Sequence, residues 1–200
     1  MEIAAMWTAA ILAGGQARRL GGVDKSALPV GSDSILDRQL ELLRPLTPHI
    51  LIVVGAHGRR DAGVRVVVDR IAGAGALGGL YTALVEAPTE QVLVIACDMP
   101  FLTAPFLTRL AECGSDADAA VPRDDRGRHP LCASYHRRIA VHVRSRIDRG
   151  LLRVGDALDG LDVREMGPDE LAAFNPDGRL LLNVNTPADY EQARALTSSR

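Results

Sequence analysis

Residues 9–25 form the sequence AAILAGGQARRLGGVDK, and this stretch decides the fold. The apolar run Ala9–Ala13 ends at the glycine pair Gly14–Gly15, and a basic loop with a second glycine pair follows. A short apolar run that stops at glycines indicates a buried strand, and glycines let backbone N–H groups approach an anion closely. Ligands of open α/β sheets bind at the carboxyl ends of the strands, which is where this loop begins.

The loop carries three cations, Arg18, Arg19 and Lys25, and Lys25 is the only lysine among the 23 basic residues of the chain. The spacing fits neither the dinucleotide loop G-x-G-x-x-G nor the phosphate loop G-x-x-x-x-G-K-[ST], because no glycine directly precedes Lys25. A flexible surface turn is the simpler interpretation. The two glycine pairs and three cations together favour an anion-binding loop.

Composition narrows the class of protein. The chain has 200 residues, of which 47% are apolar, 24% charged and 4% aromatic, with a net charge of −2. These values are typical of one globular domain; we expect its core at about residues 8–196, with a short polar tail at 197–200. They give neither the basic field nor the aromatic platform of a nucleic-acid-binding protein. The apolar opening of the chain is too short to span a membrane.

The cysteines point to a compartment. There are three, Cys97, Cys113 and Cys132, and none lies in a C-x-x-C pair. Neither a zinc ribbon nor a disulfide framework is therefore indicated, and the pattern fits the reducing cytoplasm.

Short β-branched runs alternate with amphipathic stretches, which predicts an α/β domain in three Rossmann-like layers with a mixed, mostly parallel central sheet. The expected strands are covered on both faces, like those of parallel sheets. They are Ala9–Ala13, Ile50–Val54, Val64–Val68, Val92–Ala96 and Ala119–Val121. The expected helices are Ile35–Leu46, Leu77–Ala87, Ala104–Cys113, Arg138–Arg149 and Ala188–Leu196. Between Leu151 and Phe174 we expect a helix, a strand at Asp162–Glu165 and a second short helix, and Arg123–His129 is predicted to be a loop.

Two further apolar runs end in an aspartate. Asp98 follows Val92–Ala96 in the sequence CDMP, and Asp69 follows Val64–Val68 and precedes the small-residue loop Gly73–Leu80. A carboxylate at a strand end is well placed for Mg²⁺ that also contacts substrate phosphates. Small residues at a helix N-terminus allow an anion or a planar ring to approach. The alternative for Asp98 is that it caps a turn or the next helix.

Two weaker signals lie later in the chain. His129 and Pro130 follow three arginines, Arg123, Arg126 and Arg128, and Asn183 and Asn185 stand in the sequence NVNTP at 183–187. The arginines are also explained as a solvated surface, and the asparagines as a turn with side-chain-to-backbone hydrogen bonds.

In this order and spacing, the segments resemble the molybdenum cofactor guanylyltransferases of the nucleotide-diphospho-sugar transferase superfamily. The resemblance spans most of the chain and rests first on LAGGQARRLGGVDK at 12–25, which fits the family pattern LAGGxxxRxGGxDK throughout. Asp69, GALGG at 75–79, CDMP at 97–100, His129-Pro130 and NVNTP add weight by their order. The chain departs from the family at 75–79, where the family commonly has GPLAG: Ala76 replaces proline, which softens the loop, and Gly78 replaces alanine.

The resemblance implies transfer of GMP from GTP to molybdopterin, usually with molybdenum already bound, which releases pyrophosphate. It implies that Leu12, Ala13, Gly14 and Gly15 line the GTP site, that Lys25 contacts the phosphates with Arg19 beside it, and that Asp69 contacts the nucleotide. Asp98 would hold Mg²⁺, or Mn²⁺ in its place. His129, Asn183 and Asn185 would lie toward the pterin.

The same resemblance gives the expected partners: GTP and molybdopterin as substrates, proteins that insert molybdenum or accept the finished cofactor, and neither nucleic acid nor membrane. Related cytidylyltransferases usually open with LAAG, so Gly14 leaves a methyl group's space that favours the larger guanine. Two alternatives stay open. One is a molybdopterin cytidylyltransferase or another nucleotidyltransferase of the superfamily; the other is a non-catalytic GTP-binding module in cofactor delivery.

Overall fold

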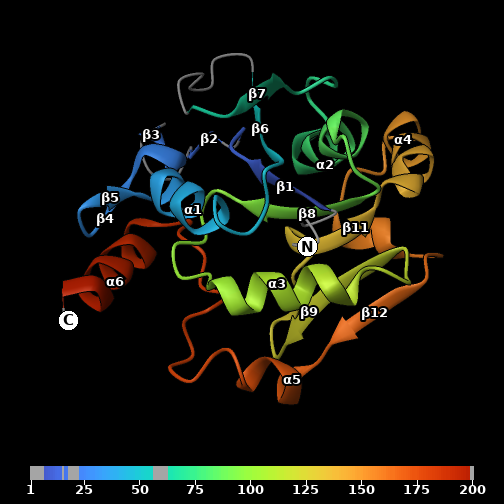
Figure 1. Ribbon diagram of the computed structural model, residues 1–200. Helices are drawn as coiled ribbons and strands as arrows, with labels where there is room; N and C mark the ends of the chain where they lie inside the picture. The colour runs from blue at the N-terminus through green and yellow to red at the C-terminus, as the bar shows by residue number, and fades with distance from the viewer. Residues whose placement is uncertain (1–6, 15, 18–22, 56–62, 199–200) are drawn as a thin grey trace.

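A computed structural model describes residues 7–14, 16–17, 23–55 and 63–198, apart from the side chains of residues 16, 17, 23–25 and 198 (Figure 1). At its centre three strands run parallel: β1 (Trp7–Leu12) pairs with β6 (Ile50–Val54) on one side and β8 (Gln91–Ala96) on the other. They belong to an eight-stranded sheet with the order β10-β9-β11-β8-β1-β6-β7, in which β12 also pairs with β9. The predicted α/β class with a mixed sheet is confirmed.

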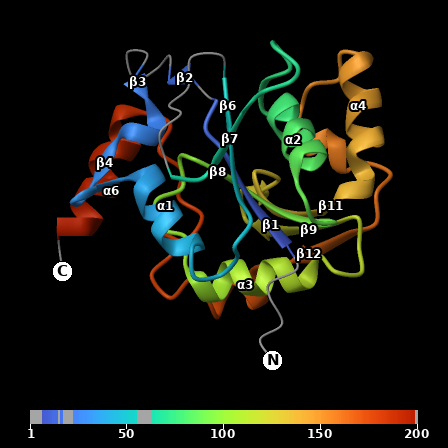
Figure 2. The same ribbon diagram turned by 45° about the horizontal axis from the view of Figure 1, so that its top comes forward.

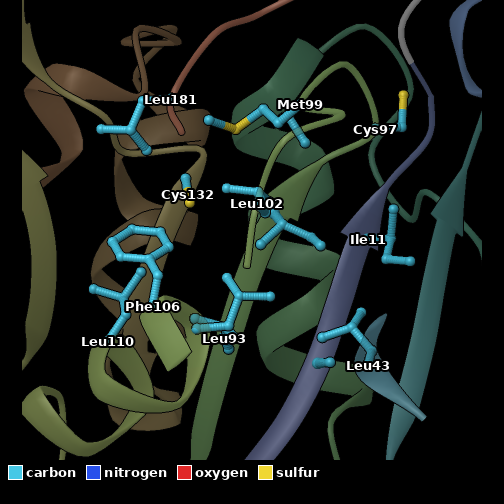
Figure 3. Packing of buried hydrophobic residues seen from close by; sticks show 14 of the residues in the cluster. Ile11, Leu43, Leu93, Cys97, Met99, Leu102, Phe106, Leu110, Cys132 and Leu181 are labelled. Atoms are coloured by element: carbon cyan, nitrogen blue, oxygen red, sulfur yellow. The ribbon is translucent and has the colours of Figure 1, made fainter. Parts of the chain in front are cut away.

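Helices cover both faces of this sheet (Figure 2). Alternate side chains of β1 point to opposite faces: Ile11 packs in the cluster that contains α1 (Ile35–Leu43) and α3 (Ala104–Cys113). Ala10 packs in the cluster that contains α2 (Gly75–Glu86) and α4 (Ala140–Asp148). Figure 3 shows Ile11, Leu93 and Phe106 in the first cluster, and all three are fully buried. Because both faces are covered, these strands are nearly continuous apolar runs.

The other half of the sheet is antiparallel. It contains β9 (Ala119–Asp124), β10 (Gly127–Arg128) and β11 (Cys132–His136), and β12 (Val163–Met166) pairs parallel with β9. The loop predicted at 123–129 is wrong, because β9 and β10 form a hairpin there. Gly127 supplies the positive φ (+113°) of its turn, and the Asp124 carboxylate accepts the Arg126 N–H at 2.9 Å. The polarity of this segment reflects an exposed edge of the sheet.

Four other elements differ from those predicted. Strand β7 (Arg65–Val68) lies at the sheet edge, so it is only partly covered, and Val68 is 40% exposed. Helix α2 begins at Gly75, so the GALGG segment is its first turn and not a loop. Helix α1 ends at Leu43, before the proline-containing segment that follows. The helix expected from Arg138 begins as a short 3₁₀ turn, Arg137–Ile139, and continues as α4.

The C-terminal part of the chain follows the predicted order. The 3₁₀ turn Gly155–Leu158 precedes β12, and α5 (Pro168–Ala172) follows it. Helix α6 (Pro187–Ser198) packs beside β4 (Pro29–Val30), which pairs with β5 (Asp33–Ser34) (Figures 1 and 2). In the described ranges, each helix falls short of the length and apolarity that a membrane crossing needs.

Candidate active site

The carboxyl ends of β1, β6 and β8 lie side by side. Ala13 donates its N–H to the carbonyl of Val53 at 2.8 Å, and Cys97 donates to the carbonyl of Leu12 at 3.1 Å. Ala13 is buried, and Leu12 is partly buried against the glycine face of α2. The structure therefore gathers the Leu12–Gly14 segment, the end of β6 and the Asp98 turn at one edge of the sheet.

Gly14 lies against the backbone of the neighbouring strand. A β-carbon on Gly14 would stand 3.2 Å from the backbone nitrogen of Gly55 and 3.7 Å from the carbonyl carbon of Val54. Such a contact is tighter than side chains ordinarily make, so close packing of two backbones is itself a reason for glycine at this position. The space that Gly14 leaves therefore borders the backbone of residues 54 and 55.

The rest of the glycine-rich loop is described only in part. The backbones of β2 (Gln16–Ala17) and β3 (Val23–Asp24) pair in antiparallel register, and Lys25 begins a 3₁₀ turn, Lys25–Ala27, immediately afterwards. Gly15, Arg18 and Arg19 lie outside the described residues, as does the side chain of Lys25. Their proposed contacts with phosphate stay predictions.

Asp69 follows β7 and lies against the first turns of α2. Its N–H donates to the carbonyl of Val54 at 2.8 Å, and its Oδ1 accepts the Thr82 hydroxyl at 2.9 Å and the Ile71 N–H at 3.0 Å. A β-carbon on Gly78 would stand 2.9 Å from Asp69 Oδ2. Asp69 thus ties β7 to α2 through Oδ1, and the absent side chain at Gly78 makes room for Oδ2.

Asp98 stands in the turn after β8 and is partly buried. Its carbonyl accepts the N–H of Val184 at 2.8 Å, so the NVNTP segment crosses the end of β8 directly at Asp98. The neighbouring Asn183 has its Oδ1 buried without a hydrogen-bond partner among the described residues. Two sequence motifs predicted to serve one site are therefore brought together by backbone geometry.

Asn185 has a different environment. It is exposed, and its N–H and that of Thr186 donate to Asp189 Oδ2 at 2.9 and 2.8 Å. The Thr186 hydroxyl accepts the N–H of Asp189 at 3.2 Å, which completes a reciprocal cap at the start of α6. The Asn185 backbone therefore belongs to the N-terminal cap of α6, and the expected role of its side chain toward the pterin stays a prediction.

His129 lies at the base of the β9–β10 hairpin. Its Nε2 is 2.9 Å from Asp124 Oδ1, and its imidazole is 13% exposed. The pKa of Asp124 falls to about 2: burial on its own would raise it, and hydrogen bonds from Arg126 and His129 outweigh that effect. Arg126 also donates to the carbonyl of Leu181 at 3.3 Å, which links the hairpin to the segment that precedes Asn183.

The donor set suits a metal that is shared with a substrate. Among the described side chains, no group of three or more His, Cys, Asp or Glu residues is arranged to hold an ion. Mg²⁺ is usually bound through one or two carboxylates together with substrate phosphates, and Asp98 at a strand end can supply such a carboxylate. The residues present fit this mode of binding.

Three residues at the site were not predicted from the sequence. Thr82 donates a hydrogen bond to Asp69, and Asp124 lies 2.9 Å from Nε2 of His129. Gln39 of α1 donates a hydrogen bond to the main chain of the turn that contains Asp98. Of these, Gln39 is indicated by the sequence, because it is a polar residue on an otherwise apolar helix face. The partners of Asp69 and His129 come from positions that only the folded chain brings near.

Comparison with known proteins identifies the family of the chain. Residues 9–161 match the family model of the MobA-like NTP transferase domain. A probable molybdenum cofactor guanylyltransferase of Chloroflexus aggregans is 34% identical over 98% of this chain and 97% of its own length. One of Pelotomaculum thermopropionicum is 33% identical over 96% and 94%. The crystal structure of molybdopterin-guanine dinucleotide biosynthesis protein A from Archaeoglobus fulgidus superposes with a TM-score of 0.83 at 25% identity, covering 96% of this chain and all of that one.

Fold, site and family model together define a nucleotidyltransferase, in which the carboxyl edge of a mixed sheet carries the motif residues. Within that class, the chain belongs to the molybdenum cofactor guanylyltransferase family.

Proposed function

We propose that the chain transfers GMP from GTP to molybdopterin, giving molybdopterin guanine dinucleotide and pyrophosphate. The observation that carries this proposal is the hydrogen bond from the Val184 N–H to the main-chain carbonyl of Asp98, because it places the NVNTP segment against the turn that bears the strand-end carboxylate. A transferase of this kind needs a nucleotide site and an acceptor site that meet at the reacting phosphates. Family membership favours this enzyme over a non-catalytic GTP-binding module.

In the proposed reaction, an oxygen of the molybdopterin phosphate forms a bond to the α-phosphorus of GTP. The bond from that phosphorus to the bridging oxygen breaks, and pyrophosphate leaves with the electron pair. The attacking phosphate is already anionic at neutral pH, so no general base is needed. The work of the protein is to bring two charged phosphates together in line and to balance the charge of the departing pyrophosphate.

Each residue then has a role. Leu12, Ala13, Gly14 and Gly15 would line the nucleotide site, with Asp69 at its border, and Lys25 and Arg19 would neutralise charge that grows on the leaving phosphates. Asp98 would hold Mg²⁺, or Mn²⁺, and the bound ion would supply Lewis-acid chemistry to the phosphates. On the acceptor side, the buried Oδ1 of Asn183 suits an N–H donor such as a pterin carries. His129 and Asn185 would also lie toward the pterin.

We further propose that these residues act in one domain spanning residues 1–200. A cytoplasmic location fits the three cysteines, which are buried free thiols. GTP and molybdopterin are the proposed small-molecule partners, and the acceptors of the product would be proteins that insert molybdenum or use the cofactor.

Thermal unfolding with GTP, CTP, ATP or NAD, each with and without Mg²⁺, tests the nucleotide half of the proposal. A ligand at a hundred times its dissociation constant adds about 2.7 kcal/mol, a shift of about 5–10 °C for a chain of this size. We expect GTP with Mg²⁺ to give the largest shift. A larger shift with CTP would favour the cytidylyl relatives, and no shift with any nucleotide, alone or with molybdopterin, would contradict the proposal.

A further inference from the structure

Gln39 is a buried polar residue on the apolar face of α1. The other buried residues of that helix are Ile35, Leu36, Leu40 and Leu43, and Gln39 itself is only 2% exposed. Desolvating a side-chain amide costs free energy unless its hydrogen bonds are remade in the protein. A leucine would pack at such a position without this cost, so the bonds that the amide makes indicate what it does.

Both bonds go to the turn that carries Asp98. Gln39 Nε2 donates to the carbonyl of Ala96 at 2.9 Å and to the carbonyl of Met99 at 3.1 Å. These carbonyls flank the two residues Cys97 and Asp98, so one amide bridges the start and the end of the turn. Figure 3 shows Cys97 and Met99, the two neighbours of Asp98 in the sequence, among the buried residues of the first cluster.

The two ends of the Gln39 amide differ in their partners. Gln39 Oε1 is buried and has no hydrogen-bond partner among the described residues. A buried acceptor without a partner is destabilising. The side chain thus leaves one acceptor unsatisfied while both of its N–H groups hold the turn.

Two further hydrogen bonds fix the same turn from other elements. Cys97 donates its N–H to the carbonyl of Leu12 in β1, and Val184 donates to the carbonyl of Asp98. The Gln39 amide is the side-chain contribution from α1 to this set. All of these bonds engage the main chain of the turn, so they set the direction in which the Asp98 side chain leaves the backbone.

We propose that Gln39 is a positioning residue for Asp98 and sets the affinity of the site for its divalent cation. The inference rests on the proposed role of Asp98 in binding that cation. Mg²⁺ demands near-ideal octahedral geometry, so a small rotation of a ligating carboxylate lowers affinity. Residues that orient metal ligands typically change metal affinity by 10–100-fold when they are replaced.

Two variants of Gln39 and one control test this role. Gln39→Met keeps the length of the side chain and removes both donors, and Gln39→Glu keeps its shape but sets a carboxyl group against two carbonyl oxygens. The control is Gln91→Met, because Gln91 lies at the opposite end of the same strand, β8, and its amide donates to the Ser134 hydroxyl at 2.6 Å. The control therefore also loses a hydrogen bond from a glutamine.

The measurement is Mn²⁺ binding by the chain in the presence of GTP, followed by the electron paramagnetic resonance signal of free Mn²⁺ and compared with a blank of GTP and Mn²⁺ alone, because GTP itself binds Mn²⁺. We expect the dissociation constant for Mn²⁺ to rise at least about tenfold in both Gln39 variants and to stay unchanged in Gln91→Met. GTP binding without metal should stay as in the wild type. Pyrophosphate release should recover as Mg²⁺ is raised, which a general loss of folded protein would not allow.

Wild-type affinity for Mn²⁺ in a folded Gln39 variant would overturn the inference. If neither Gln39 variant folds while Gln91→Met does, Gln39 serves the fold as a whole and the positioning role is rejected. If the wild type itself binds no Mn²⁺ with GTP, the proposed metal site fails instead, and the two failures are thereby distinguished.

Discussion

The α-carbon of Gly78 faces the carboxylate of Asp69 so closely that a methyl group there would stand 2.9 Å from Oδ2. The carboxylate cannot simply turn away, because Thr82 and the Ile71 N–H hold its other oxygen. The same methyl group would stand 3.0 Å from the Ile71 carbonyl. In this chain, the glycine at position 78 therefore leaves the space that the Asp69 carboxylate occupies.

Gly78→Ala should displace Asp69. We expect a loss of stability of about 1–3 kcal/mol, typical of overpacking, together with weaker GTP binding. Gly79→Ala is the matched control, because its methyl group would lie 3.5 Å from the Leu12 side chain, an ordinary contact. Alanine is favoured over glycine in a helix by about 1 kcal/mol, so the control should keep or gain stability. Thermal unfolding with and without GTP measures both; equal behaviour of the two variants would refute the Asp69 contact.

Gly14→Ala separates two explanations of this glycine. Because the new methyl group would press on the backbone nitrogen of Gly55 at 3.2 Å, we expect a loss of about 1 kcal/mol in stability. GTP and CTP binding should weaken by similar factors. Selective loss of GTP binding would instead support the idea that Gly14 makes space for the purine. Isothermal titration with both nucleotides gives the ratio.

The lowered pKa of Asp124 predicts that the stability of the folded chain falls at acid pH. Its pKa is lowered from 3.8 to about 2 in the folded chain, so its contribution to stability is complete above pH 4 and disappears as pH falls toward 2. Asp124→Asn should therefore lower Tm at pH 6 and flatten the fall of Tm between pH 4 and 2. Asp125→Asn, which removes the neighbouring exposed charge, serves as the control. Parallel Tm curves for wild type and Asp124→Asn would contradict this prediction.

Asp98 and Lys25 should dominate turnover. Asp98→Ala and Lys25→Ala are each expected to lower kcat by about two to three orders of magnitude, or about 3–4 kcal/mol, because each would act on charge at the transferred phosphates. Circular dichroism and Tm establish that the variants fold. A folded Lys25→Ala enzyme with nearly wild-type kcat would remove the lysine from the mechanism.

The central strands could be predicted from the sequence because they are covered on both faces. Val92–Ala96, for example, is an uninterrupted apolar run and is buried throughout. Strand β11 was not predicted because most of its residues are small or polar and do not form an apolar run. Its Ser134, for example, is fully buried and accepts a hydrogen bond from the Gln91 amide. The hairpin at 123–128 looked like a loop because an edge strand exposes its charged side chains.

The site was predictable where a motif fixes the backbone. Asp98 and NVNTP were singled out separately, and the Val184 hydrogen bond explains why both belong to one place. Local sequence carries no signal for contacts between distant positions, such as Thr82 with Asp69 or Gln39 with Ala96. Even so, a glutamine between Leu36 and Leu40 on a buried helix face was a visible anomaly.

The most direct test of the account is pyrophosphate release by the purified chain with molybdopterin, Mg²⁺ and either GTP or CTP. We expect one pyrophosphate per molybdopterin guanine dinucleotide formed, release that needs both GTP and the pterin, and little release with CTP. Faster release with CTP would identify a cytidylyltransferase. A folded chain that binds GTP but releases no pyrophosphate with molybdopterin would contradict the proposed reaction.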